Sequence, residues 1–481
     1  MKRGDCLRKY KKRIWFLTGI LIFILISIIV GIVQYNKDLP KDISYESPIY
    51  KTNDLQFVYD LTYQHQDERV MEQNLMQEAL RIIDNAQQLL LIDMFLYNDD
   101  YDREKGTYPN SAQQITDALI NKRLSNPALP ISVITDSMNT LYGSNDSIFF
   151  EELKKHDIQV IITNMKPMRD SNPIYSSIWR PYLQWWKPSQ NGFLPNAFNP
   201  DGGKASVGSY LDLLNFKANH RKIVMNESQA LITSANLTHD GSSFHSNIGF
   251  VVQGGILTDL YESEKAVAEL SDVSLPDATF ESDTTEGELE VKLITEGKIK
   301  DAMLQALTAA NEQSTVKIGV FYISDRDIVK ALKDAAGRGA SIQMILDPNK
   351  DAFGIEKNGI PNRQVAAELM KEENIEIRWY DTNGEQYHSK FLMVDNESET
   401  ILIGGSANFT RRNLADYNLE TNLHIKMPAT HNVSKEVHTY FERLWTNEDG
   451  IYTVEFEQYE DQSLWKKAFY RFQEWTGLST F

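Results

Sequence analysis

The hydrophobic pattern begins with a long apolar stretch near the N-terminus. Residues 14–33 read IWFLTGILIFILISIIVGIV, and no charged residue interrupts them. A helix of that length, at about 1.5 Å per residue, spans roughly 30 Å, the hydrocarbon thickness of a bilayer. No small-residue cleavage site follows Val33, so the pattern predicts an uncleaved transmembrane helix rather than a signal peptide. Residues 1–13 carry seven Lys or Arg and one Asp, a net charge of +6. The positive-inside rule therefore predicts a cytoplasmic basic tail, a single pass and an extracytoplasmic remainder.

Downstream of residues 34–54, which we expect to be a stalk, apolar strands alternate with amphipathic helices in two series. The first series has predicted strands at 89–97, 131–136 and 159–163, with helices at 115–124 and 150–158. The second has strands at 316–323, 342–347 and 376–380, with helices at 328–339 and 365–375. Such alternation predicts an α/β fold of two duplicated halves, with mixed, largely parallel sheets and flanking helices. The predicted halves are 55–272 and 291–450, joined by an acidic linker at 273–290 and followed by an amphipathic tail at 451–481.

An aromatic insertion at 166–215 distinguishes the first half from the second. It holds three of the eight tryptophans. Two interpretations stay open: Trp185 and Trp186 contact lipid, in an acyl-chain groove or at the bilayer surface, or the insertion covers the apolar face of the first half. In the C-terminal tail, apolar side chains that include Trp465, Phe469 and Trp475 share one helical stripe. We favour packing of this stripe against the second half over an interfacial helix.

Composition narrows the classes of partner. The 481 residues carry a formal net charge of −18, and residues 34–481 alone carry 42 basic and 66 acidic side chains, a net of −24. Such an acidic chain is a poor general polyanion binder, which argues against nucleic acid as the partner. The single cysteine, Cys6, excludes an internal disulfide framework and a Cys-based metal cluster. An exported domain without disulfides favours a bacterial cell surface.

A polar motif occurs twice, at matching places in the two halves. NHRKIVMNE (219–227) precedes LITSANLT (231–238), and YHSKFLMVD (387–395) precedes LIGGSANFT (402–410). Each copy has His-x-Lys, an acid five residues after the Lys, and then Ser-Ala-Asn. The candidate catalytic residues are therefore His220, Lys222, Asn236, His388, Lys390 and Asn408. The candidate supporting residues are Glu227, Ser234, Asp395 and Ser406, of which the two acids are expected to serve the scaffold.

These residue types suit phosphodiester chemistry. A neutral imidazole attacks phosphorus and forms a covalent phosphohistidine, while a second, protonated imidazole donates to the leaving alkoxide. Lys222 and Lys390 place positive charge beside the non-bridging oxygens, and Asn236 and Asn408 add neutral donors. This chemistry needs no metal or other cofactor, and the sequence offers no obvious metal cluster.

The paired motifs resemble those of the phospholipase D superfamily over most of residues 55–450. The resemblance implies two halves about a pseudo-twofold axis and one active site at their junction. It also implies that His220 is the nucleophile and His388 the general acid. The members most similar in style are bacterial membrane-anchored phospholipases and cardiolipin synthases.

The second motif fits the family pattern fully, and Glu420 in YNLE (417–420) matches a family carboxylate that orients a catalytic His. The first motif departs from the pattern, because Glu227 replaces Asp, Thr233 replaces Gly, and Gly249 in SNIG (246–249) stands at the expected place of the carboxylate. The residue that orients His220 therefore stays open among Asp136, Glu152 and Asp240.

The sequence thus predicts a membrane-anchored phosphodiesterase or phosphatidyltransferase whose substrate is a phospholipid and whose acceptor is water or an alcohol. Arg411 and Arg412, after the second Ser-Ala-Asn, either bind a second phosphate or lipid headgroup or form a solvated turn. The alternatives are an anchored nuclease of the same superfamily and a catalytically impaired phosphodiester-binding protein. The sequence leaves the oligomeric state open.

Overall fold

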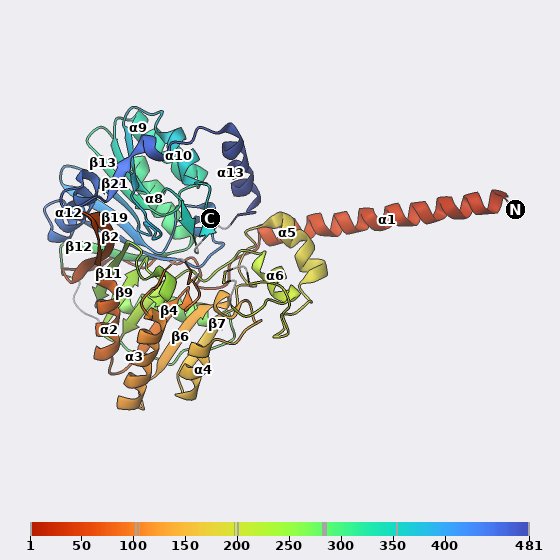
Figure 1. The fold of residues 1–481 in the computed structure, drawn as a ribbon, viewed down its shortest axis with the longest axis horizontal. Helices are drawn as coiled ribbons and strands as arrows, with labels where there is room; N and C mark the ends of the chain where they lie inside the picture. The colour runs from red at the N-terminus through yellow and green to blue at the C-terminus, as the bar shows by residue number, and fades with distance from the viewer. Residues whose placement is uncertain are drawn as a thin grey trace.

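Two mixed sheets, one from each half of the chain, form the body of the protein (Figure 1). The structure is a computed structural model that describes residues 2–101, 103–104, 106–196, 198–199, 202–280, 286–352 and 355–479. Part of the expected linker 273–290 lies outside these described residues. The α/β fold of two duplicated halves is confirmed.

The first sheet has eight strands in the order β3-β2-β11-β9-β8-β4-β6-β7. Their bounds are β2 (Leu55–His65), β3 (Glu68–Glu72), β4 (Leu90–Met94), β6 (Ile131–Asp136), β7 (Gln159–Thr163), β8 (Lys222–Asn226), β9 (Gln229–Thr233) and β11 (Asn247–Gln253). The helices of this half are α2 (Leu75–Asn85), α3 (Ser111–Ser125), α4 (Ile148–Lys155) and α7 (Ile256–Glu269).

The second sheet repeats this order and has nine strands, β1-β12-β20-β19-β18-β13-β14-β17-β21. Their bounds are β1 (Tyr50–Thr52), β12 (Leu289–Thr295), β13 (Thr315–Val320), β14 (Ser341–Leu346), β17 (Ile375–Tyr380), β18 (Lys390–Asp395), β19 (Glu399–Gly405), β20 (Thr421–Pro428) and β21 (Thr453–Glu455). Its helices are α8 (Gly297–Ala309), α9 (Arg326–Gly337), α10 (Asn362–Leu369) and α12 (Asn432–Thr446).

Strand direction corrects one expectation. The strands predicted from the βαβ pattern are parallel, β4 with β6 and β6 with β7, as are β13, β14 and β17. The strands that carry and follow the motifs pair antiparallel, so the sheets are mixed but not largely parallel. The cause is local: β8 and β9 are joined at a tight turn in which the Asn226 side chain accepts the N–H groups of Ser228 and Gln229. Such short links permit only antiparallel pairing.

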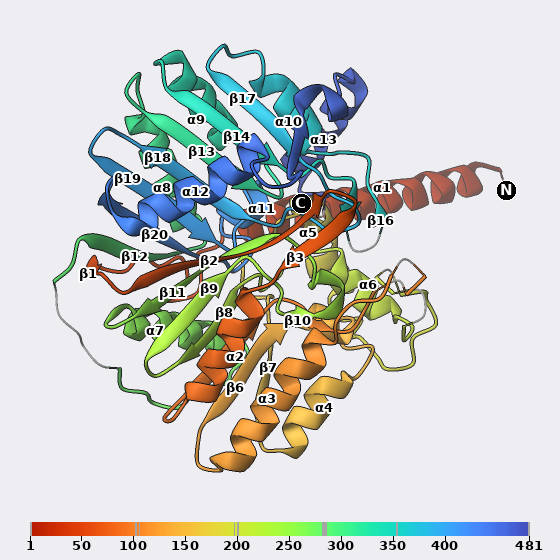
Figure 2. The same cartoon turned by 60° about the vertical axis from the view of Figure 1, so that its left-hand side comes forward.

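One hydrophobic core is shared by the two halves. It contains strand residues of both sheets together with α7 and α12, whereas α2, α3 and α4 cover the other face of the first sheet and α8, α9 and α10 that of the second. Across the junction, Phe250 of β11 packs on Gly404 of β19, where an added Cβ would lie 2.9 Å from the ring. Figure 2 shows β11 and β20 running where the two halves meet. This contact brings the loops that carry the two motifs together.

The N-terminal helix α1 (Lys2–Tyr35) projects away from the body (Figure 1). Its segment Arg8–Tyr35, 28 residues long, contains an 18-residue stretch with a mean hydropathy of 3.0 and is long and apolar enough to cross a membrane. Residues 34–54, expected to be a stalk, are docked on the second sheet, since β1 pairs with β12 and Ser47 donates its N–H to the Leu293 carbonyl at 2.9 Å.

The aromatic insertion folds into α5 (Pro173–Ile178), a short π-helix η2 (Trp179–Leu183) and α6 (Val207–Leu213). The tail forms α13 (Leu464–Thr476). Its polar side packs on the second half through Tyr470 and Glu474, whereas the apolar stripe points outward and Trp465 is 87% exposed. The expected packing of that stripe against the second half is therefore wrong: buried polar contacts such as Ser324 Oγ to Glu474 Oε2 at 2.7 Å orient the helix the other way.

Candidate active site

Both histidines of the paired motif are held by the opposite half of the chain. His220 donates its backbone N–H to the Leu419 carbonyl at 2.9 Å, and His388 donates its N–H to the Ser246 carbonyl at 2.8 Å. These matching bonds relate the two motifs by pseudo-twofold symmetry and place both at one junction. Both side chains are buried there, with exposed fractions of 7% and 5%.

One buried carboxylate in each half fixes the backbone just before the histidine of that half. Asp136, at the end of β6, accepts the N–H of Asn219 at 2.8 Å, and Asp347, after β14, accepts the N–H of Tyr387 at 2.8 Å. Burial raises the pKa of each carboxyl to about 7. Asp136, one of the three acids considered for orienting His220, therefore holds the neighbouring backbone instead.

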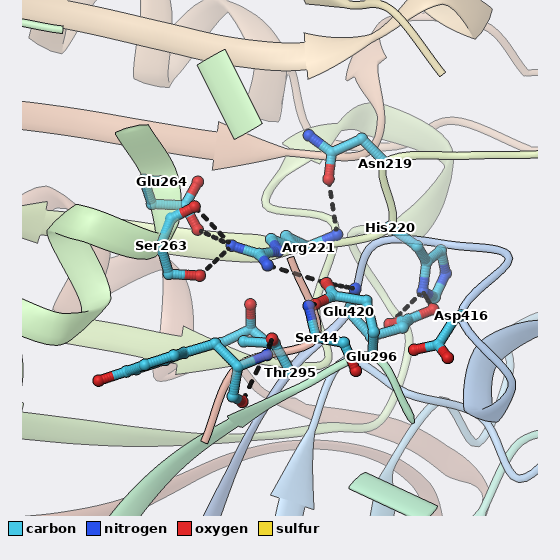
Figure 3. A network of polar contacts seen from close by, with 12 residues as sticks. Ser44, Asn219, His220, Arg221, Ser263, Glu264, Thr295, Glu296, Asp416 and Glu420 are labelled. Carbon is cyan, nitrogen blue, oxygen red and sulfur yellow. Dashed lines mark hydrogen bonds and ion pairs between the residues drawn. The ribbon is translucent and has the colours of Figure 1, made fainter. Parts of the chain in front are cut away.

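The residue that contacts the His220 ring comes from the second half. Nδ1 of His220 lies 2.9 and 3.0 Å from the two carboxylate oxygens of Glu420 (Figure 3). Glu420 is fully buried and also accepts hydrogen bonds from Ser406 and Asn413. Of the other two acids considered, Glu152 pairs with Lys155 on the surface at 3.0 Å, and Asp240 accepts the N–H of Ala112 at the start of α3. The carboxylate found in the second motif thus orients the histidine of the first.

His388 has an amide where His220 has a carboxylate. Its Nδ1 lies 3.1 Å from Oδ1 of Asn247, which also accepts a hydrogen bond from Ser234 at 3.1 Å. The N–H of Ser234 bonds to Ile248 just as that of Ser406 bonds to Thr421. Asn247 is therefore the counterpart of Glu420, and the assignment of Gly249 to that place is wrong by two residues. From Asn236 to Asn247 there are 11 positions and from Asn408 to Glu420 there are 12, so the two loops differ in length.

The two lysines lie beside the histidines in equivalent ways. Nζ of Lys222 donates to the His220 carbonyl at 2.9 Å, and Nζ of Lys390 donates to the His388 carbonyl at 2.5 Å. Each ammonium also lies over an aromatic ring, Phe95 at 5.1 Å and Phe321 at 5.6 Å. Burial lowers the pKa of Lys222 to about 7. Burial also lowers the pKa of Lys390 well below its usual value, and the nearby charge of Lys222 lowers it further.

Both imidazoles are neutral at pH 7 in the unliganded site. Burial lowers the pKa of His220 to about 4, although Glu420 opposes the shift. Burial and the charge of Lys390 hold the pKa of His388 well below its usual value. Burial works against ionisation of Glu420, yet the His220 contact and Lys222 keep the pKa of this carboxyl below its usual value. A carboxylate at Nδ1 sets the tautomer of His220 and leaves Nε2 without a proton.

The amides of the Ser-Ala-Asn segments have unmet hydrogen-bonding capacity. The side-chain carbonyl oxygens of Asn236 and Asn408 are buried without a partner in the described part of the chain. A buried acceptor without a partner is costly. A ligand hydroxyl could donate to these oxygens, and the amide nitrogens of the same side chains can donate to phosphate oxygens.

The two motif acids hold the scaffold, as expected from the sequence. Glu227 accepts the backbone N–H groups of Gln87, Gln88 and Leu89 at 3.0–3.2 Å, which fixes the connection from α2 to β4. Asp395 lies 3.0 Å from Nε2 of His438 and accepts a hydrogen bond from Thr400.

The four residues predicted to bind substrate differ in their surroundings, since the two tryptophans are exposed and Arg412 is buried. Trp185 and Trp186 are 73% and 62% exposed. Arg411 donates to the Tyr35 hydroxyl at 2.9 Å and to the Trp475 carbonyl at 3.2 Å, and Arg412 donates to the Gly477 carbonyl at 3.2 Å. The two arginines thus tie α1 and α13 to the second half, and substrate contact by any of the four stays a prediction.

Sequence reasoning missed Arg221, the middle residue of the first His-x-Lys. Its fully buried guanidinium donates to Glu264 of α7 at 2.7 Å and to Glu296 of the second half at 2.8 Å. The same oxygen of Glu296 accepts the backbone N–H of Glu420 at 3.0 Å (Figure 3). Arg221 therefore joins the halves directly behind the His220–Glu420 pair. An arginine between two predicted catalytic residues was the available signal.

The comparisons with known proteins agree with this geometry. Residues 303–445 match the family model described as cardiolipin synthase, PLD-like domain. This match lies within the second half of the chain and supports a relationship to the phospholipase D superfamily. No curated protein matches its sequence.

Solved structures show how far the fold extends. The structure of phosphatidylserine synthase from Haemophilus influenzae Rd KW20 is similar with a TM-score of 0.56 at 10% identity, covering 90% of this chain and 96% of that one. Polyphosphate kinase from Porphyromonas gingivalis matches at 12% identity over 76% of this chain and 47% of that one, with a TM-score of 0.42. The phospholipase D family member Nuc from Salmonella typhimurium matches at 18% identity over 35% and 99%, with a TM-score of 0.27. The first match shows that the fold spans nearly the whole chain.

Proposed function

We propose that this protein is a membrane-anchored phosphodiesterase or phosphatidyltransferase that acts on phospholipids through a phosphohistidine. The observation that carries the proposal is the asymmetry between the two rings: a carboxylate contacts Nδ1 of His220, and an amide contacts Nδ1 of His388. The two histidines therefore suit different steps of a two-step transfer.

In the first step, Nε2 of His220 attacks phosphorus and the bond from phosphorus to the leaving oxygen breaks. Positive charge develops on the His220 ring, where Glu420 stabilises it. Protonated His388 gives the proton on Nε2 to the leaving alkoxide. Because only a neutral amide supports His388, its imidazolium is strongly acidic, and the negative charge of the bound phosphodiester favours the protonated form that the step needs.

In the second step, water or an alcohol attacks phosphorus and the bond to Nε2 of His220 breaks, returning the electron pair to the ring. His388 takes the proton of the attacking hydroxyl and is ready for the next cycle. Lys222 and Lys390 place positive charge beside the non-bridging oxygens, and Asn236 and Asn408 supply amide donors. Hydrolysis and transfer share this intermediate and differ only in the acceptor.

Three features support a lipid substrate. The family match is to a cardiolipin synthase-like domain, and the fold match over nearly the whole chain is to a phosphatidylserine synthase. Helix α1 provides an anchor with an apolar segment of bilayer length and a basic tail before it. The positive-inside rule then puts the body outside the cytoplasm.

The test uses the full chain in vesicles that contain labelled phosphatidylglycerol, with labelled single-stranded DNA offered in parallel and EDTA present throughout. His220→Ala and His388→Ala are compared with His156→Ala, which removes a partly exposed histidine of the surface. We expect release of phosphatidic acid or appearance of cardiolipin. This activity should be lost in His220→Ala and His388→Ala and kept in His156→Ala. Cleavage of DNA alone would make the protein an anchored nuclease. Inactivity towards both substrates would favour the catalytically impaired binding protein.

A further inference from the structure

The insertion of the first half lies against α1 inside its apolar run. The ring of Tyr182 stacks on Phe23 with centroids 4.5 Å apart, and its hydroxyl donates to the Phe23 carbonyl at 3.1 Å. Eight residues further along α1, an added Cβ on Gly31 would lie 3.2 Å from Cβ of Ser177. Figure 1 shows α5 alongside the end of α1 that meets the body.

The depth of these contacts follows from helix geometry. Phe23 precedes Val33, the last residue of the apolar run, by ten positions, which corresponds to about 15 Å at 1.5 Å per residue. The uncharged run is only long enough to fill the hydrocarbon once, about 30 Å. If residues 14–33 cross the bilayer, as proposed above, then α5 and η2 share the outer leaflet with the second half of α1.

Most polar groups of this segment are satisfied, as a lipid environment requires, although the buried Asn172 Nδ2 and Trp179 Nε1 have no partner in the described part of the chain. Ser176 and Ser177 donate their hydroxyls to backbone carbonyls of the same turn, both at 2.8 Å. The Tyr175 hydroxyl donates to the Leu211 carbonyl at 2.6 Å. Arg180 donates twice to the buried Asp170 carboxylate, at 2.8 and 2.9 Å. The side chains left outward are apolar, among them Ile174 and Ile178.

Helix α13 continues the same surface. Arg411 joins the end of α1 at Tyr35 to the end of α13 at the Trp475 carbonyl, and an added Cβ on Gly477 would collide with the Ser171 carbonyl, two residues before α5. The helix runs across the direction of α1 on the side from which α1 leaves the body (Figure 1). It presents Trp465, Phe469, Phe472 and Trp475 to the outside. An amphipathic helix of this kind lies in the plane of a membrane interface.

We propose that α5, η2, the following Trp185 and Trp186, and α13 form a membrane collar that is embedded in the outer leaflet around α1. The proposal rests on the anchor proposed above, and it commits to lipid as the occupant of this apolar surface. The body is then not tethered at a distance but seated in the bilayer, with the apolar face of α13 buried at the boundary between headgroups and acyl chains.

The collar contacts the segment that leads into the candidate active site. Ser171, just before α5, donates its hydroxyl to the Asn215 carbonyl at 2.8 Å, and Lys217 donates to Asp170 at 2.8 Å. Residues 215–219 lead directly into His220. The collar is thus joined directly to the segment that carries His220.

The test measures water exposure of single labels on the full chain in phospholipid vesicles. Because Cys6 is the only cysteine, Cys6→Ser gives a background for Ile178→Cys and Trp475→Cys in the collar. Leu21→Cys places a label within the membrane-spanning segment. Leu124→Cys on α3 and Ile49→Cys beside β1 are the water-exposed controls, because both replace exposed apolar side chains and both elements lie away from α1 (Figures 1 and 2). A nitroxide on each cysteine is probed with a polar nickel chelate and with oxygen.

The collar sites are expected to resemble the span. Collisions with the nickel chelate at 178 and 475 should be roughly five-fold fewer than at 124 and 49, because a polar reagent is excluded from hydrocarbon. If the chelate reaches the label at position 178 or 475 as readily as at position 124, while the label at position 21 is protected, the collar is refuted and the membrane anchor is retained. Chelate access at 21 as well would overturn the anchor and the collar together.

Discussion

The His220–Glu420 pair makes the sharpest prediction, through the substitution Glu420→Gln. The carboxylate is fully buried, lies 2.9 and 3.0 Å from Nδ1 of His220, and comes from the opposite half of the chain. Gln keeps the size and one acceptor oxygen but removes the charge. The substitution therefore separates electrostatic support of the ring from its placement.

The expected loss follows from the charge that develops on the ring. Two unit charges about 4 Å apart interact by about 4 kcal/mol at an effective dielectric constant near 20. The Gln oxygen retains a neutral hydrogen bond worth about 1 kcal/mol. A net loss of about 3 kcal/mol corresponds to a rate of phosphohistidine formation lower by about 10²-fold.

The assay is a single-turnover measurement with a labelled phosphodiester, in which the phosphohistidine is trapped at alkaline pH. Asn247→Asp is the mirror variant, because it places a carboxylate on His388. It should raise the pKa of His388 and weaken it as an acid, without loss of the intermediate. Glu264→Gln is the control for removal of a buried carboxylate that pairs with Arg221 rather than with a histidine.

A decrease of less than three-fold in Glu420→Gln, with an unchanged melting temperature, would refute the electrostatic role of the pair. So would an Asn247→Asp variant that forms the intermediate on His388, since the two rings would then have exchanged roles.

Three further outcomes are expected. His388→Ala should slow formation of the phosphohistidine by about 10²–10⁴-fold with an alkoxide leaving group and much less with p-nitrophenolate, and equal losses in this single-turnover rate with both would contradict its role as the acid. Burial lowers the pKa of His220 to about 4. In a pH profile of the wild-type enzyme, kcat/KM should therefore fall as the pH drops through that value, because the protonated ring cannot attack. A fall in kcat/KM centred near pH 6.5 would contradict this prediction. Arg221→Met leaves Glu264 and Glu296 buried without their cation and should lower the free energy of unfolding by about 3–5 kcal/mol, whereas Arg81→Met, at an exposed pair with Glu78, should lower it by less than about 1 kcal/mol; denaturant melts compare the two.

Local pattern was enough for much of the molecule. The apolar run 14–33 identified the helix that became α1, and the βαβ spacing identified β4, β6 and β7 with their counterparts. The repeated His-x-Lys and Ser-Ala-Asn located the residues that meet at the junction. Each of these signals lies within a few neighbouring positions, where helix and strand periodicity or a motif acts directly.

The partners of the two histidines needed the tertiary structure. Glu420 lies 200 residues after His220 and belongs to the other half, so no spacing within one motif connects them. Asn247 was missed for the same reason, together with a loop of different length. The outward face of α13 also depended on distant contacts, because its burial is decided by polar bonds such as that of Glu474 to Ser324.

The sequence by itself therefore determined the chemistry present, two imidazoles, two ammonium groups and their amides, since residue identity and short spacing carry that information. Only the tertiary structure decided which histidine receives the carboxylate and which the amide, and it also laid the aromatic insertion along α1. The physical reason is that pairing across the junction depends on how two sheets pack through Phe250 and Gly404. That packing sums many contacts between residues far apart in the chain, and no single motif records it.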